Sequence, residues 1–272
     1  MSEAPRALPR ALKEALEPGE RLSPLHPRGF SLEGWWGDDL NAAAPRGWPL
    51  PPGAAVIEAR RGYQFGPENL TLPWALRGQS SASAVVDLGA GSGSLGLLAA
   101  YALGAERLVS VELQAEQCAR LRRARASFAA AGEPLAWSVV EGDLRAPQCL
   151  GEAREALGGG GAEVAVLNPP FFPAGWGRES ASEEVARSTH ALFGGVEELL
   201  AAGVSLLAPG GALWVLYDGR RVGDLLGPMA RLGVGLGGVW CTPDLRAGRG
   251  GEVNRVWVKM GLHTCQALIK SL

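Results

Sequence analysis

The sequence predicts an α/β protein whose mostly parallel sheet is doubly wound, with helices on both faces. From residue 84 onward, apolar runs of strand length alternate with helical segments, as in βαβ units. The runs are almost continuously apolar, which is typical of strands buried on both faces. A glycine-rich turn follows the first run, at the end of the strand where open α/β sheets bind ligands. Together these observations favour an open α/β domain that binds a ligand at this end of the strands.

The alternation fixes the expected elements. The predicted strands are Ala84–Leu88, Leu108–Leu113, Leu135–Val140, Val164–Leu167 and Ala212–Tyr217. The predicted helices are Ser94–Leu103, Gln114–Ala131, Ser182–Leu207 and Gly219–Leu232. Two further strand candidates, Leu236–Cys241 and Val253–Met260, predict a hairpin that ends the sheet.

The N-terminal region has a different character, and we expect residues 1–53 to form a small extension before a main domain of residues 54–272. Arg6–Leu16 has apolar residues at helical spacing. Leu22–Gly53 is rich in Pro, Gly and Trp, which predicts irregular structure packed by aromatic rings. Ala54–Phe65 predicts a short local strand pair, and Asn69–Leu76 predicts the start of a helix.

Composition narrows the classes of function. The chain has 272 residues, is 47% hydrophobic and carries a net charge of −2, so no global positive field attracts nucleic acid. Its four cysteines form no CxxC pair, which argues against a zinc site and favours a reducing cytoplasm. Met1–Glu20 lacks the apolar core of a signal peptide, and no apolar run of about 18 residues predicts a membrane span. We expect a cytoplasmic protein without a metal site or a membrane partner.

A glycine loop and an acidic residue predict a nucleoside site. Gly89, Gly91 and Gly93 lie between a strand and a helix, where glycine allows a tight turn and a close approach of a ligand. Glu112 ends the next strand, so its carboxylate can accept both hydroxyls of a ribose. The loop therefore predicts a bound nucleoside rather than an empty turn.

Two cofactors fit this loop. Gly91–Gly96 formally matches the GxGxxG fingerprint of dinucleotide binders, which leaves a nicotinamide-dependent oxidoreductase open. Asp87 instead completes the D-x-G-x-G-x-G loop of S-adenosylmethionine binders, in which the acid holds the methionine ammonium. A carboxylate so close would repel a pyrophosphate, which favours S-adenosylmethionine. Asp143, after the third strand, can accept the adenine amine or simply cap the helix that follows.

The run Asn168-Pro169-Pro170-Phe171 follows the fourth predicted strand. Two prolines make a stiff turn, remove two backbone donors and keep Asn168 out of the helical region. The free carbonyls and the Asn amide oxygen can accept the hydrogens of a planar amine. Phe171 can stack on the ring that carries it. The run alone is also compatible with an ordinary turn.

These motifs together resemble class I S-adenosylmethionine-dependent methyltransferases with an NPPF motif. Over roughly Gly62–Met260 the chain is most similar to the bacterial N6-adenine methyltransferases of the valine tRNA anticodon loop. Gly62–Gly66 is similar to that family's G-Y-R-F-G segment, and the NPPF run continues into Gly175-Trp176-Gly177. Pro209-Gly210-Gly211, Arg249 and Asn254 also fit the family. Gln64 and Glu68 depart from its usual basic residue and aspartate.

The resemblance implies a Rossmann-like methyltransferase fold with a seven-stranded sheet and an antiparallel last strand, and residues 54–272 as the catalytic domain. It implies adenine in RNA as the methyl acceptor, with tRNA as the class of RNA. The implied catalytic residues are Asn168, Pro169, Pro170 and Phe171. The implied cofactor-binding residues are Tyr63, Phe65, Gly66, Asp87, Gly89, Gly91, Gly93, Glu112, Leu113, Asp143, Leu144 and Asn168. The implied substrate-binding residues are Phe171, Trp176 and Arg178.

Two further alternatives stay open at this point. A methyltransferase for the side-chain amide of glutamine in a protein can use the same acceptor geometry as the NPPF run. A non-catalytic module that keeps the cofactor fold is the other alternative, although Asp87, Glu112 and Asn168 are all present.

Overall fold

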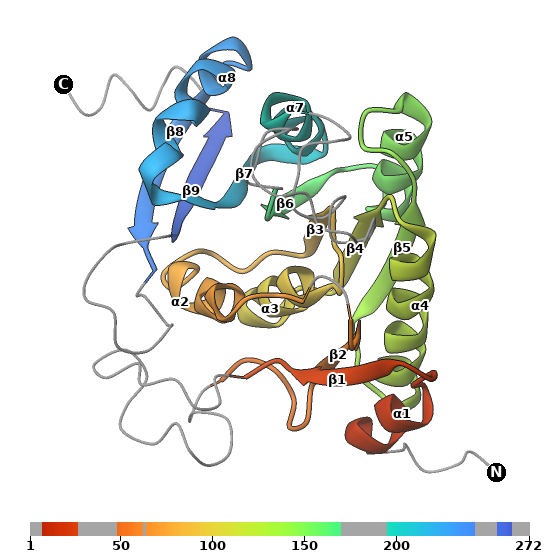
Figure 1. Cartoon of the computed structure of the whole chain (residues 1–272). Helices are drawn as coiled ribbons and strands as arrows, with labels where there is room; N and C mark the ends of the chain where they lie inside the picture. Colours follow the sequence, from red (N-terminus) through yellow and green to blue (C-terminus); the bar gives the residue numbers. More distant parts are fainter. Residues whose placement is uncertain (1–6, 27–47, 62–63, 170–194, 243–254, 263–272) are drawn as a thin grey trace.

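A seven-stranded sheet forms the centre of the computed structural model, which describes residues 7–26, 48–61, 64–169, 195–242 and 255–262. Its strands are β3 (Ala84–Leu88), β4 (Arg107–Glu112), β5 (Ala136–Glu141), β6 (Ala162–Leu167), β7 (Leu207–Asp218), β8 (Val234–Cys241) and β9 (Arg255–Leu262). Their order is β5-β4-β3-β6-β7-β9-β8 (Figure 1). Strands β3 to β7 are parallel, and β9 is antiparallel to both of its neighbours. The predicted fold, including the C-terminal hairpin, is confirmed.

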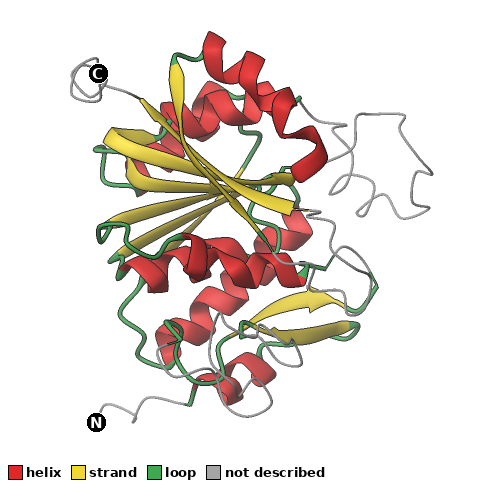
Figure 2. Ribbon diagram, turned by 90° about the vertical axis from the view of Figure 1, so that its left-hand side faces the viewer, coloured by secondary structure: helices red, strands yellow, loops and turns green. Residues whose placement is uncertain are grey.

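Helices cover both faces of the sheet (Figure 2). Helices α2 (Leu72–Ala75), α3 (Ser94–Leu103) and α4 (Ala115–Ala130) share one hydrophobic core with one face of the sheet. Helices α5 (Pro147–Ala156), α7 (Val196–Ser205) and α8 (Leu226–Arg231) share a second core with the other face. This double covering explains why the strands are apolar at nearly every position.

Helix α3 has the bounds that the sequence predicts because glycine marks both of its ends. Gly93 precedes the helix with φ of +80°, and Gly104 ends it with φ of +65°. The Gly104 N–H donates to the carbonyls of Ala100 and Tyr101, as in a left-handed helix cap. A side chain at either position would be strained, so glycine sets the length of this helix.

The N-terminal region contains helix α1 (Leu8–Glu14) and a second, two-stranded sheet. Strand β1 (Glu20–Pro24) pairs antiparallel with β2 (Ala55–Ala59). The prediction of a local strand pair within residues 54–65 is therefore wrong, because β2 pairs with a segment about 35 residues upstream in the register Glu20↔Ala59. Strand β1 is short and polar, so its sequence carries no clear strand pattern. The predicted boundary between residues 53 and 54 lies between these two paired strands.

Other helix bounds differ from the predictions for local reasons. A 3₁₀ helix, η1 (Pro67–Thr71), precedes α2, and another, η2 (Gly219–Leu225), replaces the first half of the predicted Gly219–Leu232 helix. Helix α5 starts at Pro147 with Ala146 at its N-cap, so Asp143 does not cap it. Of the predicted helix Ser182–Leu207, only the part from residue 195 lies within the described residues, and it holds α7.

Two kinds of feature are absent from the described residues. No helix among them is both long and apolar enough to cross a membrane. Within the described residues, no group of three or more His, Cys, Asp or Glu side chains is arranged to hold a metal ion.

Candidate functional site

The parallel strands deliver the predicted site residues to one edge of the sheet. Residues Leu88 and Val111 are partners in the β3–β4 pair, and Leu88 and Leu167 are partners in the β3–β6 pair. Glu112 pairs with Glu141 between β4 and β5. The glycine loop, Glu112, Asp143 and Asn168 all follow these positions directly, so the structure brings them together at the carboxyl ends of four adjacent strands.

The glycine loop is open on one side and packed on the other. Gly89, Gly91 and Gly93 have φ of +63°, +53° and +80°, which only glycine adopts without strain. A Cβ at Gly89 or Gly91 would meet no atom within 4 Å, whereas a Cβ at Gly93 would lie 2.7 Å from the Leu121 side chain. The first two glycines therefore leave space for a ligand to approach the backbone.

Glu112 is buried, with 5% of its surface exposed, and its carboxylate accepts two backbone donors. Its Oε2 accepts from the Gly91 N–H and its Oε1 from the Gln114 N–H, both at 2.8 Å. Burial raises the pKa of this carboxyl, and the backbone donors act in the opposite direction. Because a carboxylate has about four lone-pair sites, Glu112 can still accept from a hydroxyl of a ligand.

Asp87 is almost fully enclosed at the end of β3. Its Oδ2 accepts from the Gly96 N–H in helix α3 at 2.8 Å. Burial, with a smaller contribution from the negative charge of Glu112, raises the pKa of the Asp87 carboxyl to about 8. A cationic group of a ligand near this carboxyl would favour its ionised form.

The Asp143 carboxylate already accepts hydrogen bonds from Arg145, a neighbour that the sequence prediction did not consider. Its Oδ1 accepts from the Arg145 backbone N–H at 2.9 Å, and its Oδ2 accepts from the Arg145 guanidinium at 2.5 Å. The hydrogen bonds from Arg145 lower the pKa of Asp143. The two leucines predicted to bind the cofactor differ in exposure. Leu144, which follows Asp143, is buried, whereas Leu113, which follows Glu112, is 41% exposed. Asp143 thus needs a rearrangement of Arg145 to offer both of its oxygens to an adenine amine.

Asn168 lies directly after β6 and carries a buried acceptor. Its Oδ1 is buried and makes no hydrogen bond within the described part of the chain. The next residue, Pro169, is also buried. The remaining predicted residues of this region, Pro170, Phe171, Trp176 and Arg178, lie outside the described residues, as does Tyr63. A buried acceptor costs free energy when no donor meets it, so Asn168 Oδ1 is suited to accept a hydrogen bond from a ligand.

The segment that contains Phe65 and Gly66 connects the N-terminal sheet to the glycine loop. The Phe65 N–H donates to Glu58 Oε1 at 2.9 Å, and Glu58 is only 3% exposed. Four residues later, Asn69 Nδ2 donates to Ser94 Oγ at 2.9 Å, at the start of helix α3. Asn69 Oδ1 is buried and has no partner among the described residues. Gly66 has φ of −82°, so it does not need the freedom of glycine there.

Sequence reasoning missed Glu58, Asn69 and Arg145. Glu58 belongs to a strand whose partner the sequence did not reveal, and Asn69 has no motif of its own. Only Arg145 had a local signal, since an arginine two residues after an aspartate can reach its carboxylate. The residues that the structure does describe fit a nucleoside with a cationic substituent: open glycines, a carboxylate with free lone pairs, and a second buried carboxylate.

Comparisons with solved structures now assign the fold. SMU.776, a protein described as a methyltransferase and complexed with S-adenosylhomocysteine, matches with a TM-score of 0.53 and 15% identity over 76% of this chain and 53% of its own. The tRNA m1G37 methyltransferase of M. jannaschii matches with a TM-score of 0.51 and 9% identity over 78% of this chain and 55% of its own. The chain has the class I methyltransferase fold.

This likeness concerns architecture, since the identities are low and the chain spans about half the length of each of these two proteins. Neither protein-family models nor the sequences of curated proteins match the chain. The class I methyltransferase fold accounts for the sheet order and for the position of the glycine loop at the end of β3.

Proposed function

We propose that this protein is an S-adenosylmethionine-dependent methyltransferase that acts on the exocyclic amine of adenine in RNA, with tRNA as the preferred class. The observation that carries the proposal is the buried Oδ1 of Asn168, which has no hydrogen-bond partner among the residues that the structure describes. It lies at the same sheet edge as the glycine loop and Glu112, in a chain with the class I methyltransferase fold. An acceptor for an amine beside a nucleoside site is what this reaction requires.

The cofactor would be held by residues on β3 and β4. Glu112 would accept the ribose hydroxyls, Asp87 would balance the ammonium, and Gly89 and Gly91 would let the backbone approach. Leu113, half-exposed beside Glu112, would cover one face of the adenine. When bound, S-adenosylmethionine supplies a methyl group that its sulfonium has already activated.

The chain's own contribution to the chemistry is to align the amine. The nitrogen lone pair of an adenine amine is delocalised into the ring, which makes it a weak nucleophile. By accepting both hydrogens, the Asn168 amide oxygen and the Pro169 carbonyl would favour a tetrahedral nitrogen whose lone pair points at the methyl group. No strong base is needed, because the proton can leave to water after transfer.

RNA as the substrate rests on two lines of support. The NPPF run and its Gly175-Trp176-Gly177 continuation resemble the tRNA adenine enzymes, with Phe171 and Trp176 as stacking groups and Arg178 as a phosphate contact. One neighbour with the same fold, from M. jannaschii, is a tRNA methyltransferase. An adenine inside a duplex would first have to leave its stack, so we expect a loop base to be the target.

A glutamine side-chain amide in a protein is the second candidate. The same two acceptors could hold its NH₂ group, and the net charge of −2 provides no general attraction for RNA. An enzyme that acts on glutamine would require the same cofactor site but a different surface around that site.

The two candidates differ in which macromolecule receives the methyl group. We would incubate the purified protein with S-adenosylmethionine labelled in its methyl group. Total tRNA, ribosomal RNA and cell protein, each lacking the modification, would be added as acceptors in separate reactions. Our proposal predicts label in tRNA that depends on Asn168. Label in protein alone would replace the adenine proposal with the glutamine one, and no label in any acceptor would refute methyl transfer to both.

A further inference from the structure

A cavity of about 340 Å³ lies in the N-terminal region, apart from the residues proposed to hold the cofactor or the amine, except for Phe65. Strand β1 and the residues after it form one side of the cavity through Arg21, Ser23 and His26. Strand β2 contributes Glu58, and the segment before α2 contributes Pro67 and Leu70. The volume is within the usual range for small-molecule sites.

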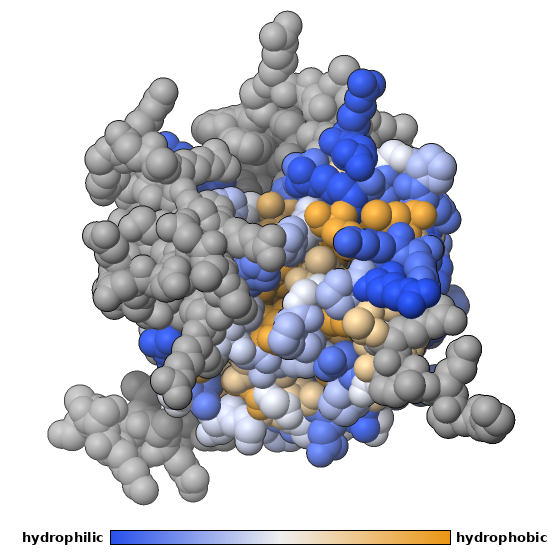
Figure 3. All heavy atoms as spheres, turned by 90° about the horizontal axis from the view of Figure 1, so that it is seen from below, coloured by the Kyte–Doolittle hydropathy of each residue, from blue (hydrophilic) through white to orange (hydrophobic). Residues whose placement is uncertain are grey.

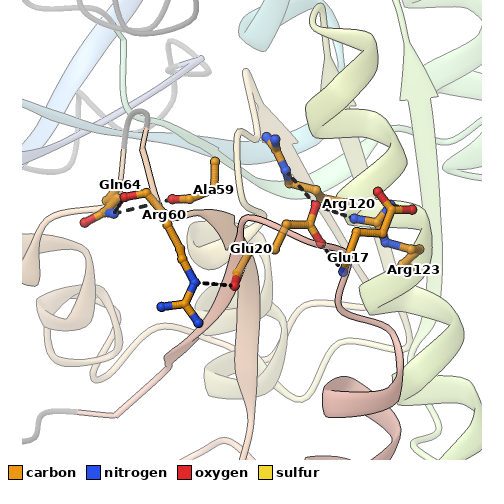
Figure 4. Close-up of polar contacts among 7 residues, drawn as sticks. All are labelled: Glu17, Glu20, Ala59, Arg60, Gln64, Arg120 and Arg123. Carbon is orange, nitrogen blue, oxygen red and sulfur yellow. Dashed lines mark hydrogen bonds and ion pairs between the residues drawn. The ribbon is translucent and has the colours of Figure 1, made fainter.

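The two faces of the β1–β2 sheet have different roles. On one face, Glu20 is buried and forms ion pairs with Arg120 and Arg123 of α4, at 3.1 and 2.5 Å (Figure 4). Arg21 follows Glu20 in the chain and is the partner of Glu58 in the antiparallel register. Because side chains alternate between the faces of a strand, Arg21 and Glu58 both lie on the opposite face of this sheet. The first face therefore anchors the sheet to α4, whereas Arg21, Ser23 and Glu58 of the second face line the cavity, which Leu22 and Pro24 also border.

The cavity wall combines apolar surface with a polar edge. Phe65, Leu70 and Pro67 are the apolar and aromatic part. On the polar edge, the Glu58 carboxylate accepts from Ser23 Oγ, from the Phe65 N–H and, at 3.4 Å, from Arg21. A flat, polar ring that stacks on one side and forms hydrogen bonds at its edge is the ligand that such a wall suits.

Arg21 can supply a donor to a ligand in the cavity. Its Nε is buried and has no hydrogen-bond partner within the described part of the chain. Its guanidinium reaches Glu58 only at 3.4 Å, and its side chain is 41% exposed, so it can turn toward a ligand. The guanidinium and the Glu58 carboxylate offer a donor and an acceptor side by side. A neutral base has both donors and acceptors at its edge, so this pair of side chains fits a base better than it fits a phosphate alone.

The cavity is also connected to the proposed reaction site. Phe65 lines it, and four residues along, Asn69 contacts Ser94 at the start of α3, next to the glycine loop. A group bound in the cavity would thus lie one short segment away from the cofactor loop. Seen from below, the visible face of the molecule shows hydrophobic residues bordered by hydrophilic ones (Figure 3).

We propose that this cavity binds a second nucleobase of the substrate RNA, a neighbour of the adenine that is methylated. The inference rests on the proposed RNA substrate. The base would stack against Phe65 and would use Arg21 as donor and Glu58 as acceptor at its edge. Because an acidic protein gains little from phosphate attraction, a pocket for a neighbouring base would give it affinity and sequence preference.

The test uses free nucleosides, so it needs no turnover. Saturation-transfer NMR would measure adenosine, guanosine, cytidine and uridine against the full chain with saturating S-adenosylhomocysteine. We expect at least one nucleoside to bind, with about ten-fold weaker binding to Arg21→Met, since a hydrogen bond from a charged group is lost. Pro24→Trp, at an exposed position of the cavity rim, should also weaken it. The control Arg10→Met removes an exposed arginine of α1 that pairs with Glu14, and should change nothing.

S-adenosylhomocysteine binding, followed by calorimetry, would establish that each variant is folded. The inference is overturned if no nucleoside binds the wild-type chain, or if one binds equally to wild type, Arg21→Met and Pro24→Trp. Binding of N-acetylglutamine amide alone, lost in both variants, would assign the cavity to a protein substrate and overturn it too. Methyl transfer to tRNA without nucleoside binding would refute only the cavity, and nucleoside binding without transfer to RNA would refute only the proposed reaction.

Discussion

Two halves of the site at the sheet edge differ in how far the protein itself completes them: the adjacent central strands β3 and β4 form the first, and the strands that flank them, β5 and β6, form the second. In the first half, the carboxylates of Asp87 and Glu112 already accept backbone N–H groups of the loop and of α3. In the second half, Arg145 occupies Asp143, and the Asn168 amide oxygen has no partner among the described residues. The first half is therefore preorganised, whereas the second half, which would hold the adenine of the cofactor through Asp143 and the target amine through Asn168, requires its ligands to be complete.

The largest effect should come from the unsatisfied acceptor. Asn168→Ala should lower turnover by about 10²–10³-fold, because one of the two acceptors that align the amine is lost. S-adenosylhomocysteine binding should stay close to wild type, which calorimetry can measure beside the turnover assay. Asn168→Asp keeps an acceptor oxygen and should lose less activity. If Asn168→Ala lost cofactor binding but kept turnover per bound enzyme, the contrast between the two halves would be wrong.

Glu112→Ala should produce the opposite pattern. We expect S-adenosylhomocysteine to bind about 10- to 100-fold more weakly, because hydrogen bonds between a carboxylate and hydroxyls contribute roughly 1.5–3 kcal/mol. Turnover at saturating cofactor should fall much less. Glu116→Ala, four residues further along, is a matched control in the first turn of α4. An unchanged dissociation constant for Glu112→Ala would remove Glu112 from the cofactor site.

A smaller effect, visible in pH dependence, should come from Asp87. Its pKa is raised in the folded protein to about 8, so its contribution to stability is present below about pH 4 and is lost as the pH rises through about 8. Without cofactor, the free energy of unfolding of Asp87→Asn relative to wild type should therefore increase with pH over this window. Urea denaturation of both proteins, with Asp224→Asn as an exposed control, measures it. A constant difference across the window would contradict the raised pKa.

The smallest effect should come from Arg145. Arg145→Ala frees both oxygens of Asp143 for an adenine amine, so S-adenosylhomocysteine should bind more tightly, by less than about five-fold, as is usual for an exposed ion pair. Arg231→Ala, which breaks an exposed pair with Glu197, serves as the control. Weaker binding of Arg145→Ala would mean that the ion pair itself orders this part of the site.

Much of the central sheet could be predicted because its strands are buried on both faces and therefore apolar. The bounds Ala84–Leu88 and Ser94–Leu103 agree with the structure, since glycines mark the turn and the helix end. The pairing of β1 with β2 could not be predicted, because β1 is short, polar and distant in sequence from its partner. In the site, strand ends and glycines placed Asp87, Glu112 and Asn168, but motif reasoning gives no account of side chains that bind one another, such as Arg145 and Asp143.

The identity of the methylated nucleoside tests the central claim most directly. Transfer RNA would be methylated with S-adenosylmethionine carrying a deuterated methyl group, digested to nucleosides and analysed by mass spectrometry. The account predicts that the deuterated methyl group appears in N6-methyladenosine and is absent from the same digest made with Asn168→Ala. A deuterated methyl group on a ribose oxygen or on a ring nitrogen of any base, with none on an exocyclic amine, would contradict it.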